Sequence, residues 1–129
     1  MAENLPSAGL ASTYSDYFVG KEVADSTARH PDYYSHKGFT AALLGKYRGA
    51  VPFGTKLRLF YRGRSVVVVV NDVGRGREGE NRVLDLSRAA MASLIGRNVD
   101  DITDGTASVI TLDGIFEAGT GTATGPVKP

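Results

Sequence analysis

The most constraining feature of this sequence is a run of five valines at residues 66–70, which leads directly into Asn71 and Asp72. An unbroken run of β-branched residues between turn-forming segments is typical of a strand that is buried on both faces. A segment rich in glycine and arginine follows at residues 74–79. We therefore predict that residues 66–70 form the central strand of the core, with all five side chains largely buried.

Asp72 is the first candidate for chemistry. It stands where a stiff, apolar strand leaves the core, so its carboxyl group is expected to be poorly hydrated. Poor hydration raises the pKa of a carboxyl group, and a raised pKa suits a general acid.

The composition limits the class of protein. With 129 residues, 42% of them hydrophobic, the chain is long enough for one compact domain. A formal charge of +1 is too small for binding of nucleic acid by counterion release. The absence of cysteine and the presence of only two histidines argue against thiolate chemistry and zinc sites, so we expect no metal and no cofactor.

The N-terminal residues 1–8 are polar and contain Pro6, so they are predicted to form a flexible leader. They lack the basic and apolar regions of a signal peptide. No stretch of the sequence reaches the ~18 apolar residues of a membrane span. We therefore expect a soluble chain that does not interact with membranes and has no visible secretion signal.

Hydrophobic patterning predicts several short elements and no alternating βαβ order, which favours a small closed β-barrel. A helix is expected at 88–95, capped by Ser87 and ended by Gly96. Residues 38–44 fit either a buried strand or a turn of helix. The barrel domain is predicted to span 9–116, followed by a tail at 117–129 that is too poor in apolar residues to fold. The remaining strands are expected at 9–14, 56–61, 81–86 and 106–112.

Several separated motifs occur along the chain. They are Ala-Ser-Thr-Tyr at 11–14, Phe-Thr-Ala-Ala at 39–42, Val-Pro-Phe-Gly-Thr-Lys-Leu at 51–57, Val-Asn-Asp-Val-Gly at 70–74 and Val-Leu-Asp-Leu-Ser-Arg-Ala-Ala at 83–90. Their identity and order resemble the double-psi β-barrel domain of rare lipoprotein A. The resemblance covers roughly residues 9–113 and implies a mainly β fold, a six-stranded double-psi β-barrel with one short helix. It also implies a surface groove for glycan strands and an architecture related to expansins and to inverting endoglucanases.

The resemblance assigns roles to individual residues. The catalytic aspartate of the family falls on Asp72, and a glutamate of the same site falls on Asp32, a shorter acid. A functional histidine of the family is replaced by Leu43, which removes a polar partner from the groove. In the expansin-like relatives the groove is also lined by the aspartate that matches Asp85, although an aspartate before a helix also serves a purely structural role.

Other candidates carry alternatives. Asp32 lies beside a proline, where an aspartate commonly forms a turn. Tyr14, which follows Thr13 in the first motif, fits either ordinary packing or a platform on which sugar rings stack. If Arg75 lay close to Asp72, its positive charge would lower the pKa of the Asp72 carboxyl group. If its side chain pointed outward, it would bind the carboxylates of peptidoglycan stem peptides or lactyl groups. We take Tyr14, Thr13, Asp85 and Arg75 as substrate-binding candidates.

Two functions follow from the resemblance. One is cleavage of peptidoglycan glycan strands as a lytic transglycosylase, with Asp72 as the acid and Asp32 or Asp85 stabilising charge. The other is a non-catalytic module that grips glycan or serves as a structural part. Without a visible export signal, we expect association with a phage particle or tail and its virion proteins, or delivery to the cell envelope or periplasm.

Overall fold

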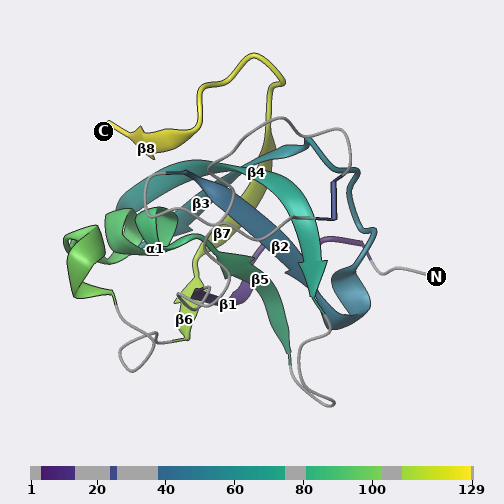
Figure 1. Ribbon diagram of the computed structural model, residues 1–129, viewed down its shortest axis with the longest axis horizontal. Coiled ribbons are helices and arrows are strands. Elements are labelled where there is room, and N and C mark those ends of the chain that lie inside the picture. The colour runs from purple at the N-terminus through teal and green to yellow at the C-terminus, as the bar shows by residue number, and fades with distance from the viewer. Residues whose placement is uncertain (1–3, 14–23, 26–37, 75–80, 103–108, 129) are drawn as a thin grey trace.

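The computed structural model describes residues 4–13, 24–25, 38–74, 81–102 and 109–128 (Figure 1). In these ranges the mainly β fold with one α-helix is confirmed, but eight strands replace the expected six, because two further strands follow residue 112. The elements are β1 (Gly9–Thr13), β2 (Thr40–Leu44), η2 (Gly45–Tyr47), β3 (Lys56–Tyr61), β4 (Arg64–Gly74), β5 (Arg82–Leu86), α1 (Arg88–Ile95), η3 (Val99–Asp101), β6 (Ile110–Leu112), β7 (Gly114–Ala118) and β8 (Gly125–Val127).

The strands form a nearly closed barrel. Seven of them follow the hydrogen-bonded order β6-β1-β5-β2-β4-β3-β7. The two ends of this path are consecutive in the chain, because only Asp113 separates β6 from β7, and the Asp113 N–H donates to the Phe60 carbonyl of β3 at 2.8 Å. The pairs β1–β5 and β2–β4 are parallel, whereas the other pairs are antiparallel.

The valine run is the centre of this barrel, as predicted. Val66, Val68 and Val70 lie in the hydrophobic core cluster and are fully buried. Val67 lies on the opposite face and is buried as well, since β8 pairs with β4 at residues 65–67. Val69 lies beyond the end of that pairing and is only half-buried, so the prediction holds for four of the five valines.

The helix follows the sequence signals. The Ser87 hydroxyl accepts a hydrogen bond from the Ala90 N–H, and Gly96 ends the helix in the left-handed conformation with φ of 73°. Ser87 also exchanges hydrogen bonds with Thr40, whose N–H donates to the Ser87 hydroxyl and whose carbonyl accepts from the Ser87 N–H. The start of α1 is therefore fixed to the start of β2.

Both ends of the chain differ from expectation. In the predicted leader, Leu5 packs against the core cluster and the Ser7 carbonyl accepts a hydrogen bond from the Ile115 N–H at 2.7 Å. In the predicted tail, β7 extends to Ala118 and β8 adds a strand beside β4 (Figure 1). The tail was expected to remain unpaired because it is poor in apolar residues, but backbone hydrogen bonds do not depend on side-chain type.

Candidate functional site

A β-bulge at Asn71 determines where Asp72 points. In the parallel pair of β2 and β4, Ala41 lies opposite Val70 and Ala42 lies opposite Asp72, so Asn71 is an extra residue. Strict alternation would place the Asp72 side chain on the core face with Val70. The extra residue switches the faces, so Val73 packs against the core and Asp72 is presented on the outer face.

Asp72 belongs to a row of side chains that crosses four strands. Ala42 lies opposite Asp72 on one side and opposite Asp85 on the other, and Asp85 lies opposite Ser12. Neighbours at the same register position share one face of a sheet. We call Asp72, Ala42, Asp85 and Ser12 the carboxylate row. Two strand spacings separate the Cα atoms of its two aspartates by about 10 Å.

The Asp72 carboxyl group is half-buried, and burial raises its pKa. Hydrogen bonds from the N–H groups of Val73 (2.9 Å) and Ala24 (3.0 Å) lower the pKa and offset part of this effect. Both bonds end on Oδ1, so Oδ2 is the oxygen suited to carry a proton towards a ligand. The net effect is a raised pKa, as expected for an acid at the end of an apolar strand.

Asp85 is held by a chain of polar contacts. Its Oδ1 accepts a hydrogen bond from the Ser12 hydroxyl at 2.9 Å, and the Ser12 oxygen accepts from Arg82 Nη1 at 2.7 Å. Ser12 is buried, whereas Asp85 is half-buried on the outer face. The alternative of a helix-capping aspartate is not needed for α1, because Ser87 supplies the cap.

The other predicted site residues divide into two groups. Thr13 follows Ser12 on β1, is buried, and donates its hydroxyl to the Leu86 carbonyl at 2.8 Å. Its role in substrate binding stays a prediction. Tyr14, Asp32 and Arg75 lie outside the described residues.

The expectation that position 43 lies in the groove is wrong for this chain. The Leu43 side chain is fully buried in the core cluster, and its neighbours at the same register position are Leu84 and Val73. The position that matches the histidine of the family therefore belongs to the core in this chain. The leucine fills apolar space there, so it does not leave a vacancy in a groove.

Sequence reasoning missed three contributors to the site. Ser12 contacts Asp85 directly, and Arg82 contacts Ser12, across 70 or more positions in the chain. Contacts between such distant residues leave no local pattern in the sequence. The third is the short segment at 24–25, where the Asp25 N–H donates to the Asn71 carbonyl at 3.0 Å beside the Ala24 contact to Asp72. Asp25 is itself a buried carboxylate next to the bulge.

Among the residues that the structure describes, no group of three or more His, Cys, Asp or Glu side chains is placed to hold a metal ion. No helix among those residues is long and apolar enough to cross a membrane.

The mixed barrel, with its two parallel strand pairs and an acidic row on its outer face, is a double-psi β-barrel. A family model described as lytic transglycolase matches residues 7–109, and the chain belongs to this double-psi β-barrel family. No curated protein matches the chain.

Two solved structures are similar in fold. The first is an apo expansin from Clavibacter michiganensis, with 23% identity and a TM-score of 0.58, where the match covers 91% of this chain and 52% of the expansin. The second is cerato-platanin 2 from M. perniciosa, with 17% identity and a TM-score of 0.54, covering 88% of this chain and 95% of that protein. The chain therefore spans about half the length of the expansin it matches.

Proposed function

We propose that this protein is directed at glycan strands and cleaves peptidoglycan as a lytic transglycosylase. Membership of the lytic transglycolase family supports this class of substrate and reaction. The observation that carries the proposal is the placement of Asp72: a bulge turns it onto the outer face, and burial raises the pKa of its carboxyl group. A protonated carboxyl group on an accessible face is what protonation of a glycosidic oxygen requires.

The reaction begins when the Asp72 carboxyl group donates its proton to the oxygen of the scissile bond, and the bond to C1 of the muramic sugar breaks. The oxocarbenium-like centre that forms at C1 is electron-poor. The Asp72 carboxylate then accepts the proton of the C6 hydroxyl group while that oxygen attacks C1. The product is a 1,6-anhydro sugar, and Asp72 ends the cycle protonated.

Asp85 supports the reaction from a distance. The Cα atoms of Asp85 and Asp72 are separated by two strand spacings, about 10 Å. In the proposed reaction the C6 hydroxyl group of the sugar attacks C1, so Asp85 is not required as a nucleophile. With its contact to Ser12, it is suited to bind sugar hydroxyl groups or to stabilise positive charge.

One observation favours the alternative of a module that binds glycan without cleaving it. Leu43, at the position of a functional histidine in the family, is a core residue here, so the histidine has no substitute at that position. In this alternative the carboxylate row binds sugar hydroxyl groups, and the raised pKa of Asp72 has no catalytic use.

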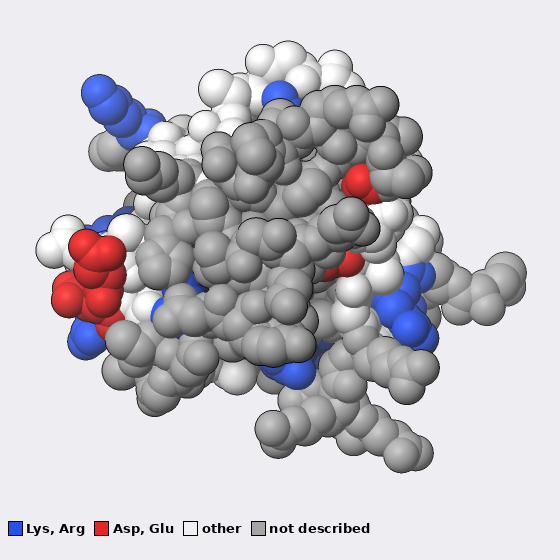
Figure 2. All heavy atoms as spheres, viewed as in Figure 1, with Lys and Arg blue, Asp and Glu red and all other residues white. Residues whose placement is uncertain are grey.

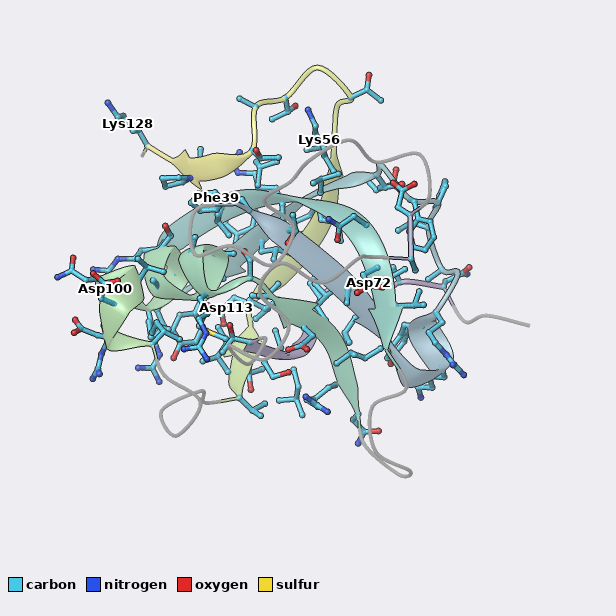
Figure 3. All side chains as sticks on the ribbon, in the orientation of Figure 1. Phe39, Lys56, Asp72, Asp100, Asp113 and Lys128 are labelled. Carbon is cyan, nitrogen blue, oxygen red and sulfur yellow. The ribbon has the colours of Figure 1, made fainter. Side chains whose placement is uncertain are left out.

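Digestion of peptidoglycan stripped of its stem peptides separates these functions. The proposal predicts 1,6-anhydromuramic products from the wild type and none from Asp72→Asn, with pelleting on sacculi retained by both proteins. Asp100→Asn is the matched control, because Asp100 is exposed and lies at the α1 end of the molecule, far from Asp72 (Figure 3). Reducing-end products would indicate hydrolysis by a water molecule, and pelleting without any product would establish the binding function.

The place of action stays a prediction. Carriage on a phage particle or tail, or delivery to the cell envelope, would each bring the chain to peptidoglycan. Detection of the protein by mass spectrometry in purified particles would support the virion, and its absence from particles made in producing cells would oppose it.

A further inference from the structure

A concave site lies away from the carboxylate row. It is a hollow of about 520 Å³ between the β3–β4 turn and the C-terminal end of α1. Three arginines line it, Arg62, Arg64 and Arg97, and we call it the arginine hollow. Arg64 begins strand β4 and Asp72 lies near its other end, eight residues further on, so the two are up to about 26 Å apart. The hollow is therefore distinct from the proposed catalytic site.

The hollow carries an excess of positive charge. Asp101 is the acidic residue among those that line it, so three guanidinium groups face one carboxylate, and Asp101 already has an interaction of its own. Among the described residues, no hydrogen bond or ion pair joins any of the three guanidinium groups to an acid. Acidic and basic atoms do lie side by side at the left edge in Figure 2, and Asp100 lies on that side of the molecule in Figure 3. Of the described residues that line the hollow, three carry a positive charge and one carries a negative charge. The Asp113 carboxylate lies next to the hollow, at the Arg62 N–H.

Arg62 occupies a position in the β3–β4 turn that arginine rarely occupies. Arg62 has φ of 47° and Gly63 has φ of 83°, as the two central positions of a type I′ hairpin turn require. Asparagine, aspartate and glycine favour such positions, and arginine does not. Here the Arg62 N–H is held by the Asp113 carboxylate at 2.8 Å, and its guanidinium group lies 5.2 Å from the centre of the Tyr61 ring. The Arg62 side chain is therefore presented from a turn whose backbone is held in place on both sides.

Arg64 is positioned by a glycine. A Cβ atom at Gly96 would lie 2.6 Å from the Arg64 guanidinium carbon, so this group rests directly on the helix end. A cation at the C-terminal end of a helix stabilises the helix dipole, which is one use of Arg64. That use does not account for Arg62 on the turn or for Arg97 beyond the helix. All three side chains line the hollow.

We propose that the arginine hollow binds an oxyanion with two negative charges, either a phosphate group or a pair of carboxylates carried by one ligand. Guanidinium groups match both chemistries, because each presents a planar fork of N–H donors to two oxygens. Three guanidinium groups offer more N–H donors than one carboxylate can accept, so a ligand with more oxygens, such as a phosphate group or two carboxylates, matches the lining better than a monocarboxylate. Binding at this hollow does not depend on cleavage of glycan. It can therefore be tested independently of the role proposed for Asp72.

Calorimetric titration of the full chain at constant ionic strength tests the proposal and separates the two sources. Inorganic phosphate and succinate are the probes, and acetate is the monovalent control. Saturable binding of either dianion, with acetate bound much more weakly, supports the site and identifies its chemistry. Equal binding of all three anions, or of none, overturns it.

Three variants locate the binding. Arg62→Asn and Arg97→Gln should each weaken dianion binding by about tenfold or more, because each removes a charge-assisted contact. Arg48→Gln removes another exposed arginine and should leave the affinity unchanged. Since asparagine suits the turn better than arginine, Arg62→Asn should unfold at the same or a higher temperature. A loss of affinity in Arg48→Gln equal to that in the other variants would show that only net charge matters and would overturn the proposal.

Discussion

Asp72 and Asp85 face the same side of the barrel and share one cross-strand neighbour, Ala42, which lies between them on β2. Ala42 itself is buried, whereas the aspartates on either side of it are half-buried. The two aspartates come from β4 and β5. The barrel topology, and no local sequence signal, brings them together.

The raised pKa of Asp72 predicts a pH-dependent cost in stability. Because the folded state binds the proton more tightly than the unfolded state, ionisation of Asp72 lowers stability as the pH rises above about 3.9. Asp72→Asn cannot ionise, so its melting temperature should exceed that of the wild type near neutral pH. The gap should close below the unfolded-state pKa. Thermal unfolding between pH 3 and pH 8 checks this, and a variant less stable at neutral pH would contradict it.

Ser12 is predicted to be a positioning residue for Asp85. Ser12→Ala removes the bond to Asp85 and the acceptor of Arg82, at a cost of about 1 kcal/mol in stability. Because Asp85 then loses its orientation, binding to sacculi should weaken as well. Ser65→Ala is the control, since Ser65 accepts from Arg58 on another part of the barrel and should lower stability without affecting binding. Equal binding by both variants would assign Ser12 a structural role only.

Leu43→His is predicted to destabilise the protein without creating activity. The imidazole would enter the core in place of a fully buried leucine, at a cost of at least about 2 kcal/mol. Leu43→Met keeps an apolar side chain of similar volume and should cost less than about 1.5 kcal/mol. Urea unfolding of the two variants provides the comparison. An unchanged midpoint for Leu43→His, together with increased product release, would place position 43 in the groove.

Removal of residues 119–129 is predicted to destabilise the barrel. The truncation deletes β8, which pairs with residues 65–67 and helps to bury Val67. Loss of that cover and of the ladder bonds should cost about 2 kcal/mol. Removal of Pro129 alone is the control. Equal melting temperatures for the full and truncated chains would show that β8 contributes nothing to folding.

The sequence predicted the elements whose signals are local. The valine run, the strand at 56–61 that precedes it, and the helix between Ser87 and Gly96 all follow from residue type and periodicity. The tail was misjudged, because β8 is a three-residue strand with little apolar content and its pairing with β4 is entirely long-range. Periodicity carries no information about such a strand.

For the site, residue type identified Asp72 but could not show how it is presented. A strand that continued its alternation would have directed Asp72 into the core, and the bulge at Asn71 is visible only from the pairing with β2. The contact of Ser12 with Asp85 depends in the same way on the parallel pairing of β1 and β5. Motif order supplied the candidates, and strand register supplied their arrangement.

The pH dependence of anhydro-product release tests the central claim that Asp72 is the general acid. The acid must be protonated in the free enzyme, so kcat/KM should fall as the pH rises through the raised pKa of Asp72. The midpoint of that fall should match the Asp72 titration followed by carboxyl-carbon NMR, and both should lie above about 3.9. Release that increases through this range, or an Asp72 carboxyl group that titrates at or below about 3.9, would contradict the assignment.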